Sequence, residues 1–472
     1  MADHAPLVER AFSIEVREGS ADLSVEGVLP SHLSGTAYWN GPGRFVRGDL
    51  HYRHWLDGDG LICALAFSGG RARVTTRFVR SGKFLAEESA ARPLFRQFGT
   101  AFPGDQLKRG IGLESPANVS AYPNGSALLA FGEQGLPWAL DPHTLETRGL
   151  FTFDGQLNEI TPFSAHPKFD PRTGEMFNFG VAFAADRPTL NLFRFDATGT
   201  LVYRRRHRLP YPASIHDFAL STSFNVFYVS PLLLDMRAFL EGGATIMDAL
   251  SWEPQRGSHL LVVSRESGEL VASLPIGHKY CLHLVNAFES AGRLIVDVVE
   301  YERPIYDQYQ VIPSLFTEVA TAAPVRYLVD VKEARVVSRQ ELPYSCAPDF
   351  PAHDLDLTGQ PYRDFWMLGI SATGRPGRKF LDQLVRFDWD TREVEIYQAP
   401  ALTYLGGEPL FLPDPAAGRT GVIVCQSFDA ERVASSFVVF DGFNVARGPI
   451  ATLRLPSPVP LLFHSSYLPD RT

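Results

Sequence analysis

The sequence predicts an all-β protein, and two observations lead to this prediction. Short apolar or alternating runs recur along the whole chain, for example at residues 72–79, 190–195 and 294–299. Turn-forming stretches rich in Gly, Pro, Asn and Asp separate these runs, as at 123–125 and 170–174. Strands at this spacing favour a sandwich, a barrel or a propeller. The 35 prolines and 39 glycines argue against a helical solenoid.

One domain spanning residues 1–472 is expected, because no stretch has the composition of a flexible linker. Three similar phrases, at 193–196, 385–388 and 438–441, each place an apolar strand before an Asp and a turn. Such phrases suit the strand ends of divergent propeller blades, although ordinary strand-and-turn chemistry explains any single one equally well.

Two stretches, 91–110 and 231–250, are expected to be helical instead. The second stretch is more apolar than an ordinary connection between strands. It therefore predicts either a buried lid helix or an exposed apolar patch that meets a membrane surface or an apolar substrate.

Composition excludes several classes of function. The net charge of −9 leaves no basic stripe to neutralise phosphates, so no nucleic-acid partner is expected. The four cysteines lie far apart, which indicates neither a zinc knuckle nor a disulfide framework. The first residues lack the basic and apolar regions of a signal peptide, and no apolar run reaches the length of a membrane span. The predicted location is the cytoplasm, with peripheral membrane contact through 231–250.

Four of the 13 histidines adjoin apolar or strand-like sequence, namely His166, His216, His283 and His464. His283 lies in an apolar segment, where an imidazole without a partner would cost roughly 1–3 kcal/mol. For any one histidine alone, a hydrogen-bonded core residue is the simpler interpretation. The four lie 50, 67 and 181 residues apart, which corresponds to one, one and three blades of about 60 residues. Equivalent positions on several blades would point toward one axis, and an all-imidazole site suits Fe(II) better than Ca²⁺ or Mg²⁺.

Three carboxylates in apolar or Pro/Gly-rich sequence could support such a site, namely Glu133, Asp349 and Glu408. A metal-bound imidazole usually donates its second N–H to a carboxylate, which fixes its tautomer and raises its basicity. For each carboxylate alone, a position in a turn is an equally good explanation.

The chain resembles the carotenoid cleavage oxygenases over nearly its whole length. The matching motifs are, in order, 38–42 (YWNGP), 55–60 (WLDGDG), 91–93 (ARP), 283–289 (HLVNAFE), Glu408-Pro409 and His464. Each match is modest alone, and their common order carries the resemblance.

The resemblance implies a seven-bladed β-propeller capped by a helical and loop dome. It also implies a non-haem Fe(II) held by His166, His216, His283 and His464, with three of these histidines oriented by Glu133, Asp349 and Glu408. Members of the family use O₂ as a co-substrate to split a conjugated C=C bond into two carbonyl products. Such a cleavage needs no general base, so no catalytic residue is expected beyond the metal centre.

One departure from the family pattern concerns Asp349-Phe350-Pro351, which stands where the family usually has Glu-Phe-Pro. Asp is one methylene shorter than Glu. Its carboxylate must therefore approach from a shifted backbone or reach its histidine through water.

The expected substrate is a carotenoid or apocarotenoid, cleaved to aldehydes. Stilbene-cleaving relatives generally place a Lys directly before the first orienting glutamate, where this chain has Gly132. Without a cation there, a phenolic stilbene is disfavoured. The residues expected to line an apolar tunnel for a polyene are Phe78, Phe98, Trp138 and Phe239. The stretch 231–250 would form the tunnel entrance on a membrane surface.

Two alternatives stay open. The same scaffold could cleave a stilbene or another aryl alkene, which a comparison of polyene and aryl-alkene products would distinguish. The propeller could also be a binding module without enzymatic activity, in which case it would not retain iron.

Overall fold

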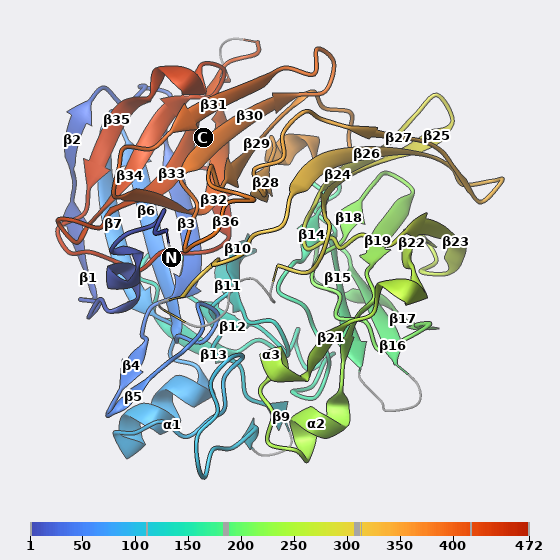
Figure 1. The fold of residues 1–472 in the computed structure, drawn as a ribbon, viewed down its shortest axis with the longest axis horizontal. Coiled ribbons are helices and arrows are strands. Elements are labelled where there is room, and N and C mark those ends of the chain that lie inside the picture. Colours follow the sequence, from blue (N-terminus) through green and yellow to red (C-terminus); the bar gives the residue numbers. More distant parts are fainter. Residues whose placement is uncertain are drawn as a thin grey trace.

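Seven antiparallel sheets stand around a common axis and form a seven-bladed β-propeller (Figure 1). The computed structural model describes residues 2–109, 112–182, 188–305, 312, 314–415 and 418–470. In each blade the strand given first below is the innermost one. The innermost strands of neighbouring blades contact one another, as β10 does with β36 and β28 with β32.

Five blades have four strands each. They are, blade by blade, β10 (Ser120–Asn124), β11 (Ala127–Phe131), β12 (Trp138–Leu140) and β13 (Thr147–Leu150); β14 (Lys168–Phe169), β15 (Met176–Ala182), β16 (Thr189–Phe195) and β17 (Leu201–Arg208); β18 (Ala219–Leu220), β19 (Phe224–Val229), β22 (Ser258–Ser264) and β23 (Leu270–Gly277); β24 (Leu284–Ser290), β25 (Arg293–Tyr301), β26 (Ala322–Asp330) and β27 (Arg335–Glu341); and β28 (Asp349–Ala352), β29 (Asp364–Gly369), β30 (Gln383–Asp388) and β31 (Val394–Gln398).

Two five-stranded blades close the ring by combining strands from both ends of the chain. One contains β36 (Ser465–Leu468), β3 (Gly35–Pro42), β6 (Gly60–Ser68), β7 (Arg71–Phe78) and β1 (Gly19–Asp22). The other contains β32 (Thr403–Pro413), β33 (Gly421–Asp429), β34 (Ala434–Asp441), β35 (Pro449–Arg454) and β2 (Ser24–Gly27). β36 therefore pairs with β3, and β2 pairs with β35. This exchange ties residues near both ends into neighbouring blades.

The burial of the strands follows from their place in the blade. Middle strands such as β6 and β33 are buried along most of their length, because each face packs against another blade. Outer strands such as β7 and β23 alternate between buried and exposed residues. The alternation that predicted strands from the sequence is therefore strongest at the outside of the ring.

Small elements in the connections between blade strands gather on one side of the ring, at the lower edge of Figure 1, and form the dome. They are β4 (Val46–Arg47), β5 (Leu50–His51), α1 (Gly82–Ala90), β8 (Lys108–Arg109), β9 (Gly112–Leu113), β20 (Leu232–Leu234), α2 (Met236–Leu240), α3 (Ile246–Ala249) and β21 (Leu250–Trp252). Short 3-10 turns also occur at Val8–Phe12, Pro254–Arg256, Leu355–Leu357 and Val445–Arg447. Among the described residues, no helix is long and apolar enough to cross a membrane.

The expected helix over 91–110 is wrong for the part that the structure describes, which ends at residue 109. The preceding residues form α1 instead, and the chain beyond it is mostly irregular. Side chains from elsewhere bind the backbone N–H groups that a helix would use. Glu87 accepts hydrogen bonds from the N–H groups of Leu94 and Phe95, and Asp57 accepts one from Gly99.

The expected helix over 231–250 is also corrected, because this stretch contains one strand and two short helices. β20 pairs with β21, and α2 and α3 lie between them. Asp235 caps the N-terminus of α2, and Thr245 caps that of α3. Gly242 and Gly243 separate the two helices, where Gly243 has a φ of 76° that favours glycine.

A buried group of charged side chains joins the dome to the blade that contains β3 and β6. Lys83 Nζ on α1 lies 2.6 Å from Asp59 Oδ1 and 2.9 Å from Glu87 Oε2. Arg47 Nη2 lies 2.7 Å from Asp59, and Arg47 Nε lies 3.0 Å from Glu87. The side chains of all four residues are at most 5% exposed. We call Arg47, Asp59, Lys83 and Glu87 the dome ion cluster.

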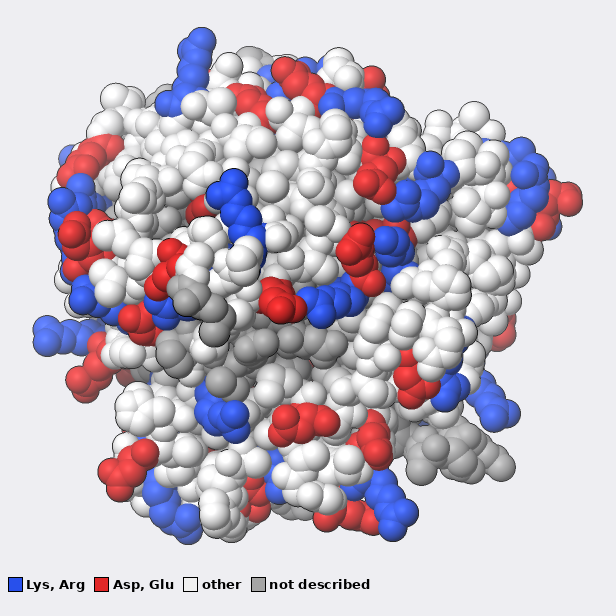
Figure 2. All heavy atoms as spheres, in the orientation of Figure 1, with Lys and Arg blue, Asp and Glu red and all other residues white. Residues whose placement is uncertain are grey.

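The surface carries both signs of charge. On the face shown in Figure 2, Lys and Arg side chains are interspersed with Asp and Glu side chains. Many of them form exposed pairs, such as Arg454 with Glu26 and Arg237 with Glu241. Exposed pairs of this kind add little to stability.

Candidate metal centre

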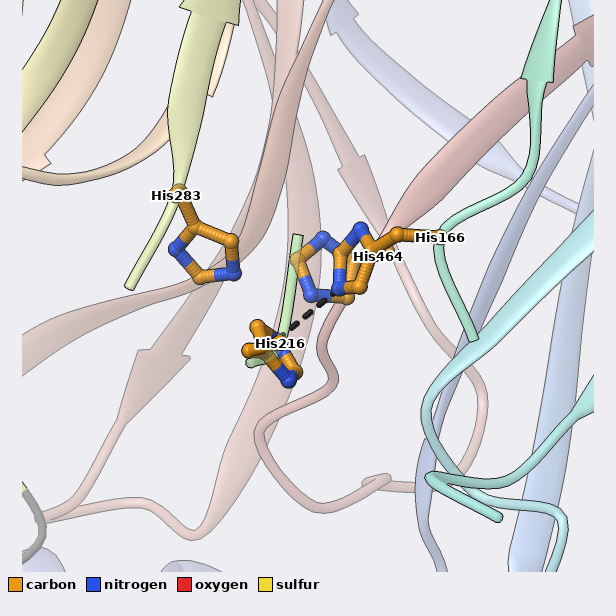
Figure 3. A group of neighbouring side chains, drawn as sticks. All are labelled: His166, His216, His283 and His464. Carbon is orange, nitrogen blue, oxygen red and sulfur yellow. Dashed lines mark hydrogen bonds between the residues drawn. The ribbon is translucent and has the colours of Figure 1, made fainter. Parts of the chain in front are cut away.

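Four histidines converge on the propeller axis, each located just before an innermost strand. His166 precedes β14, His216 precedes β18, His283 precedes β24 and His464 precedes β36. One nitrogen of each ring lies within 4.8 Å of the corresponding nitrogens of the other three. Figure 3 shows the four rings pointing toward a common centre. The structure thus brings together the four histidines that the sequence singled out.

The inward-facing nitrogens have the character of metal ligands. His166 Nε2 lies 2.9 Å from His216 Nε2, so two ring nitrogens face each other directly. His283 Nε2 is buried and has no hydrogen-bond partner in the described parts of the chain. A buried polar atom without a partner is costly, whereas a divalent cation at the centre would satisfy all four nitrogens. The donor set therefore fits a transition metal.

Three of the four rings donate their outward Nδ1–H to a carboxylate. His216 Nδ1 lies 2.9 Å from Glu133 Oε1, His283 Nδ1 lies 2.6 Å from Asp349 Oδ1, and His464 Nδ1 lies 3.0 Å from Glu408 Oε2. These are the three carboxylates expected from the sequence. Each contact fixes the tautomer that leaves the Nε2 lone pair facing the centre.

Asp349 reaches His283 directly, without an intervening water. Its strand is irregular at this point, because the pairing of β28 with β29 shifts register between Asp349 and Ala352. Phe350 between them has a φ of 55°, in the left-handed region that non-glycine residues rarely adopt. The irregular backbone places the shorter Asp side chain within hydrogen-bond distance of the ring. The sequence left two possibilities, a shifted backbone or a bridging water. The structure shows the first, because the backbone is locally irregular at Phe350.

The buried setting alters the proton affinities of the rings. Burial, together with the neighbouring imidazoles, holds the pKa of His166 well below its usual range. Burial also lowers the pKa of His464, and this effect outweighs Glu408, which raises that pKa. At His216 burial lowers the pKa too, but Glu133 and the nearby carboxylates outweigh it and leave the pKa raised. Among His166, His216 and His464, His216 is therefore the ring at which a proton competes most strongly with a metal.

Metal affinity is expected to fall as the pH falls through the raised pKa of His216. A metal must displace the proton from this ring, so the apparent Kd should rise about tenfold for each pH unit below that pKa. Above the pKa the ring is neutral and the affinity should level off. Titrations of the apoprotein with Co(II) between about pH 5 and pH 8 would measure this. An affinity independent of pH over that range would contradict the assignment of His216 as a ligand.

Two further residues near the centre were not identified from the sequence. Asp217 follows His216 directly, is buried, and lies with its Oδ1 3.7 Å from His166 Nδ1. Lys168 Nζ lies 2.8 Å from the same oxygen. Burial raises the pKa of Asp217, but Lys168 and His283 outweigh it and leave the pKa lowered. Each of these two residues lies close to a candidate histidine in the sequence, which was the available signal. The two residues are 49 positions apart, however, so the sequence does not indicate that they pair.

Neighbours of His283 hold loops of adjacent blades in place. Asn286 donates hydrogen bonds from its amide nitrogen to the carbonyls of Leu357 and Gln360, and its amide oxygen accepts one from the N–H of Gly359. Glu289 accepts hydrogen bonds from the N–H groups of Thr222 and Ser223. Glu289 thus caps the turn between β18 and β19, and it does not belong to the converging group of histidines.

A cavity of about 370 Å³ begins at the histidines and follows the innermost strands. His166, His283 and His464 line it together with residues of the turns at Pro171–Gly174 and Leu355–Thr358. Polar side chains, including those of Lys168, Asp217 and His353, contribute to its wall. The centre is therefore accessible along the propeller axis.

The four residues expected to line a tunnel lie elsewhere than this cavity. Phe78 is buried at the end of β7, where its ring stacks on that of Phe84. Trp138 begins β12 and packs against a core between two blades. For Phe78 and Trp138 the structure therefore shows packing roles. Phe98 contacts the ring of His54 in the dome, and Phe239 packs inside the dome on α2. A tunnel role for Phe98 and Phe239 stays a prediction.

Comparison with known proteins agrees with this geometry. Residues 11–469 match the family model described as retinal pigment epithelial membrane protein. The chain is 31% identical over 458 residues to the apocarotenoid-15,15'-oxygenase of Synechocystis, covering 94% of this chain and 92% of that protein. It is 29% identical over 463 residues to the isoeugenol monooxygenase of Pseudomonas putida, covering 94% of both chains.

A solved structure also shares the fold. The cobalt-substituted Synechocystis apocarotenoid oxygenase superposes with a TM-score of 0.89 at 27% identity, covering 99% of this chain and 100% of that chain. The similarity thus extends over the whole ring, including the segments that carry the four histidines.

Proposed function

The chain belongs to the carotenoid cleavage oxygenase family, and we propose that it is an Fe(II)-dependent dioxygenase that cleaves a conjugated C=C bond of a carotenoid or apocarotenoid. The observation that carries the proposal is the convergence of four buried histidines, three of them bound to carboxylates. At the level of the family, the protein is an alkene-cleaving oxygenase with a four-histidine metal site. Iron and the polyene substrate are the proposed refinements.

The chemistry that Fe(II) supplies when bound is the activation of O₂. Both atoms of O₂ are used when R–CH=CH–R′ becomes R–CHO and R′–CHO, so no other reductant is required. His166, His216, His283 and His464 would hold the ion. Glu133, Asp349 and Glu408 orient three of these rings and offset part of the +2 charge that neutral imidazoles leave uncompensated.

The position before Glu133 supports a polyene over a phenolic substrate. Gly132 offers no cation to a phenol, and any side chain there would overlap the hydroxyl group of Ser115. A lysine could be accommodated at this position only if Ser115 moved. Because the chain is also similar to an isoeugenol monooxygenase, an aryl alkene is the second candidate substrate.

A product panel tests the substrate class. Fe(II)-loaded protein would be incubated under air with β-apocarotenals of graded length, with isoeugenol and with resveratrol, and the carbonyl products identified by mass. Aldehydes from the apocarotenals alone support the proposal. Vanillin from isoeugenol, with the polyenes intact, would replace it by the aryl-alkene function. Iron-free protein is the control, and failure to retain any iron would favour a binding module.

Peripheral membrane contact through 231–250 also belongs to the proposal. Leu240 on α2 is 43% exposed, and Met236, Ile246 and Met247 beside it are partly exposed. Such a group of apolar side chains suits the collection of an apolar substrate from a lipid surface. Co-sedimentation with phosphatidylcholine vesicles should be weaker for Leu240→Ser than for the wild type, and equal binding would contradict this contact.

A further inference from the structure

His166 differs from the other three histidines in its surroundings. Among the described residues, no carboxylate is hydrogen-bonded to its Nδ1, and the nearest, Asp217 Oδ1, is 3.7 Å away. That oxygen lies closer to Lys168, whose Nζ is 2.8 Å distant. The fourth ring therefore adjoins a carboxylate that is already paired with a cation.

Asp217 connects three of the four chain segments that contain the histidines. It follows His216 on the way into β18, and its Oδ2 accepts a hydrogen bond of 2.9 Å from the N–H of Leu284. Leu284 follows His283 directly, and Lys168 lies two residues after His166 on β14. The Asp217 carboxylate thus contacts Lys168 near His166 and Leu284 next to His283, and Asp217 itself adjoins His216.

We propose that the Asp217–Lys168 ion pair positions His166, His216 and His283 for metal binding. Asp217 fixes the spacing of β14, β18 and β24 at the height of the rings. Lys168 holds the Asp217 carboxylate against β14, at 2.8 Å from its own Nζ, and so fixes the position of the strand that follows His166. The inference rests on the proposed metal centre and is independent of the substrate.

Burial explains why this arrangement can be rigid. The Asp217 side chain is 3% exposed, and a buried carboxylate is tolerated only when cations or N–H groups satisfy it. Lys168 and Leu284 supply these two contacts from different strands. Movement of any of the three strands would break a contact inside the protein, where water cannot replace it.

A second buried ion pair, formed by the residue that directly follows β14, provides a matched control. Asp170 lies four residues after His166, is 1% exposed, and pairs with Arg265. It contacts none of the four histidines in the described structure. Asp170→Asn thus removes a buried carboxylate of β14's own hairpin without altering the surroundings of the rings.

The test measures metal binding rather than turnover. Co(II) affinity and the Co(II) visible absorption spectrum would be recorded for the wild type, Asp217→Asn, Lys168→Met, Lys168→Arg and Asp170→Asn. We expect Asp217→Asn to raise the Kd for Co(II) about 10- to 100-fold and to change the spectrum. Lys168→Met should weaken binding less, because the contact with Leu284 remains, and Lys168→Arg should restore binding toward the wild-type value.

A purely structural role predicts a different pattern. Asp170→Asn and Asp217→Asn would then lower the thermal midpoint alike, with Co(II) affinity and spectrum unchanged in both, and that result would overturn the proposal. If Asp217→Asn does not fold, Lys168→Met decides in its place, since the Lys168 side chain is 23% exposed and its replacement leaves the backbone contact intact. Metal binding without alkene cleavage by the wild type would refute the proposed function and leave this inference standing.

Discussion

The His283→Ala protein is expected to fold, to lose stoichiometric iron and to show no alkene cleavage above the iron-free background. His283 contributes one of four converging nitrogens, and its Nδ1 contact with Asp349 fixes the ring's orientation. Loss of a residue that merely orients a ligand typically costs 10–100-fold in metal affinity. Loss of the ligand itself should therefore cost on the order of 100-fold or more. Alanine also leaves the Asp349 carboxylate without its imidazole partner, and reconstitution with excess Fe(II) should not restore a site that lacks one of its four nitrogens.

His353→Ala is the matched control for this experiment. His353 lines the same cavity and faces Thr358, but it does not belong to the converging group. Iron content measured by elemental analysis should stay near the wild-type value in this variant. If His283→Ala retained stoichiometric iron and normal turnover after reconstitution, the assignment of the metal centre would be wrong.

The Lys83→Met protein is expected to be destabilised by about 3–5 kcal/mol. Methionine is close to lysine in size, so the change removes the charge with little change in packing. Asp59 and Glu87 would then share Arg47 as the remaining cation of the dome ion cluster. Breaking a buried pair is costly because a charge is left in a medium that solvates it poorly. The thermal unfolding midpoint, recorded at one scan rate for both proteins, should fall by several degrees.

Arg73→Met provides the surface counterpart of that change. Arg73 pairs with Asp22 at 2.8 Å, but the two side chains are 52% and 85% exposed. Exposed pairs of this kind contribute about 0–1 kcal/mol, so the unfolding midpoint should barely change. Equal effects of the two substitutions would mean that the dome ion cluster does not anchor the dome.

The metal centre was more predictable from the sequence than the dome. The four histidines adjoin apolar or strand-like sequence, and their order along the chain matches a known family, so local pattern and resemblance agree. The orienting carboxylates were also expected, although the direct contact of Asp349 depends on the irregular backbone at Phe350. A register shift of this kind arises from the pairing of β28 with β29, which no local pattern encodes.

The dome was mispredicted because long-range contacts override its local preferences. The apolar residues of 91–110 suggested a helix, yet the N–H groups of Leu94 and Phe95 bind Glu87. Asp217 and Lys168 were overlooked for a related reason, since an ion pair between blades is invisible until the blades are assembled. In both cases the decisive partner lies in another element, and propensity alone carries no information about it.

The closing strand has a consequence for the order of events during synthesis. β36 is the last strand in the part of the chain that the structure describes, it completes the blade that contains β3 and β6, and His464 directly precedes it. During synthesis, a polypeptide that does not yet extend to His464 carries three of the four converging histidines and an unclosed ring. The full set of four nitrogens is therefore in place for a metal ion only once Ser465–Leu468 have paired with β3.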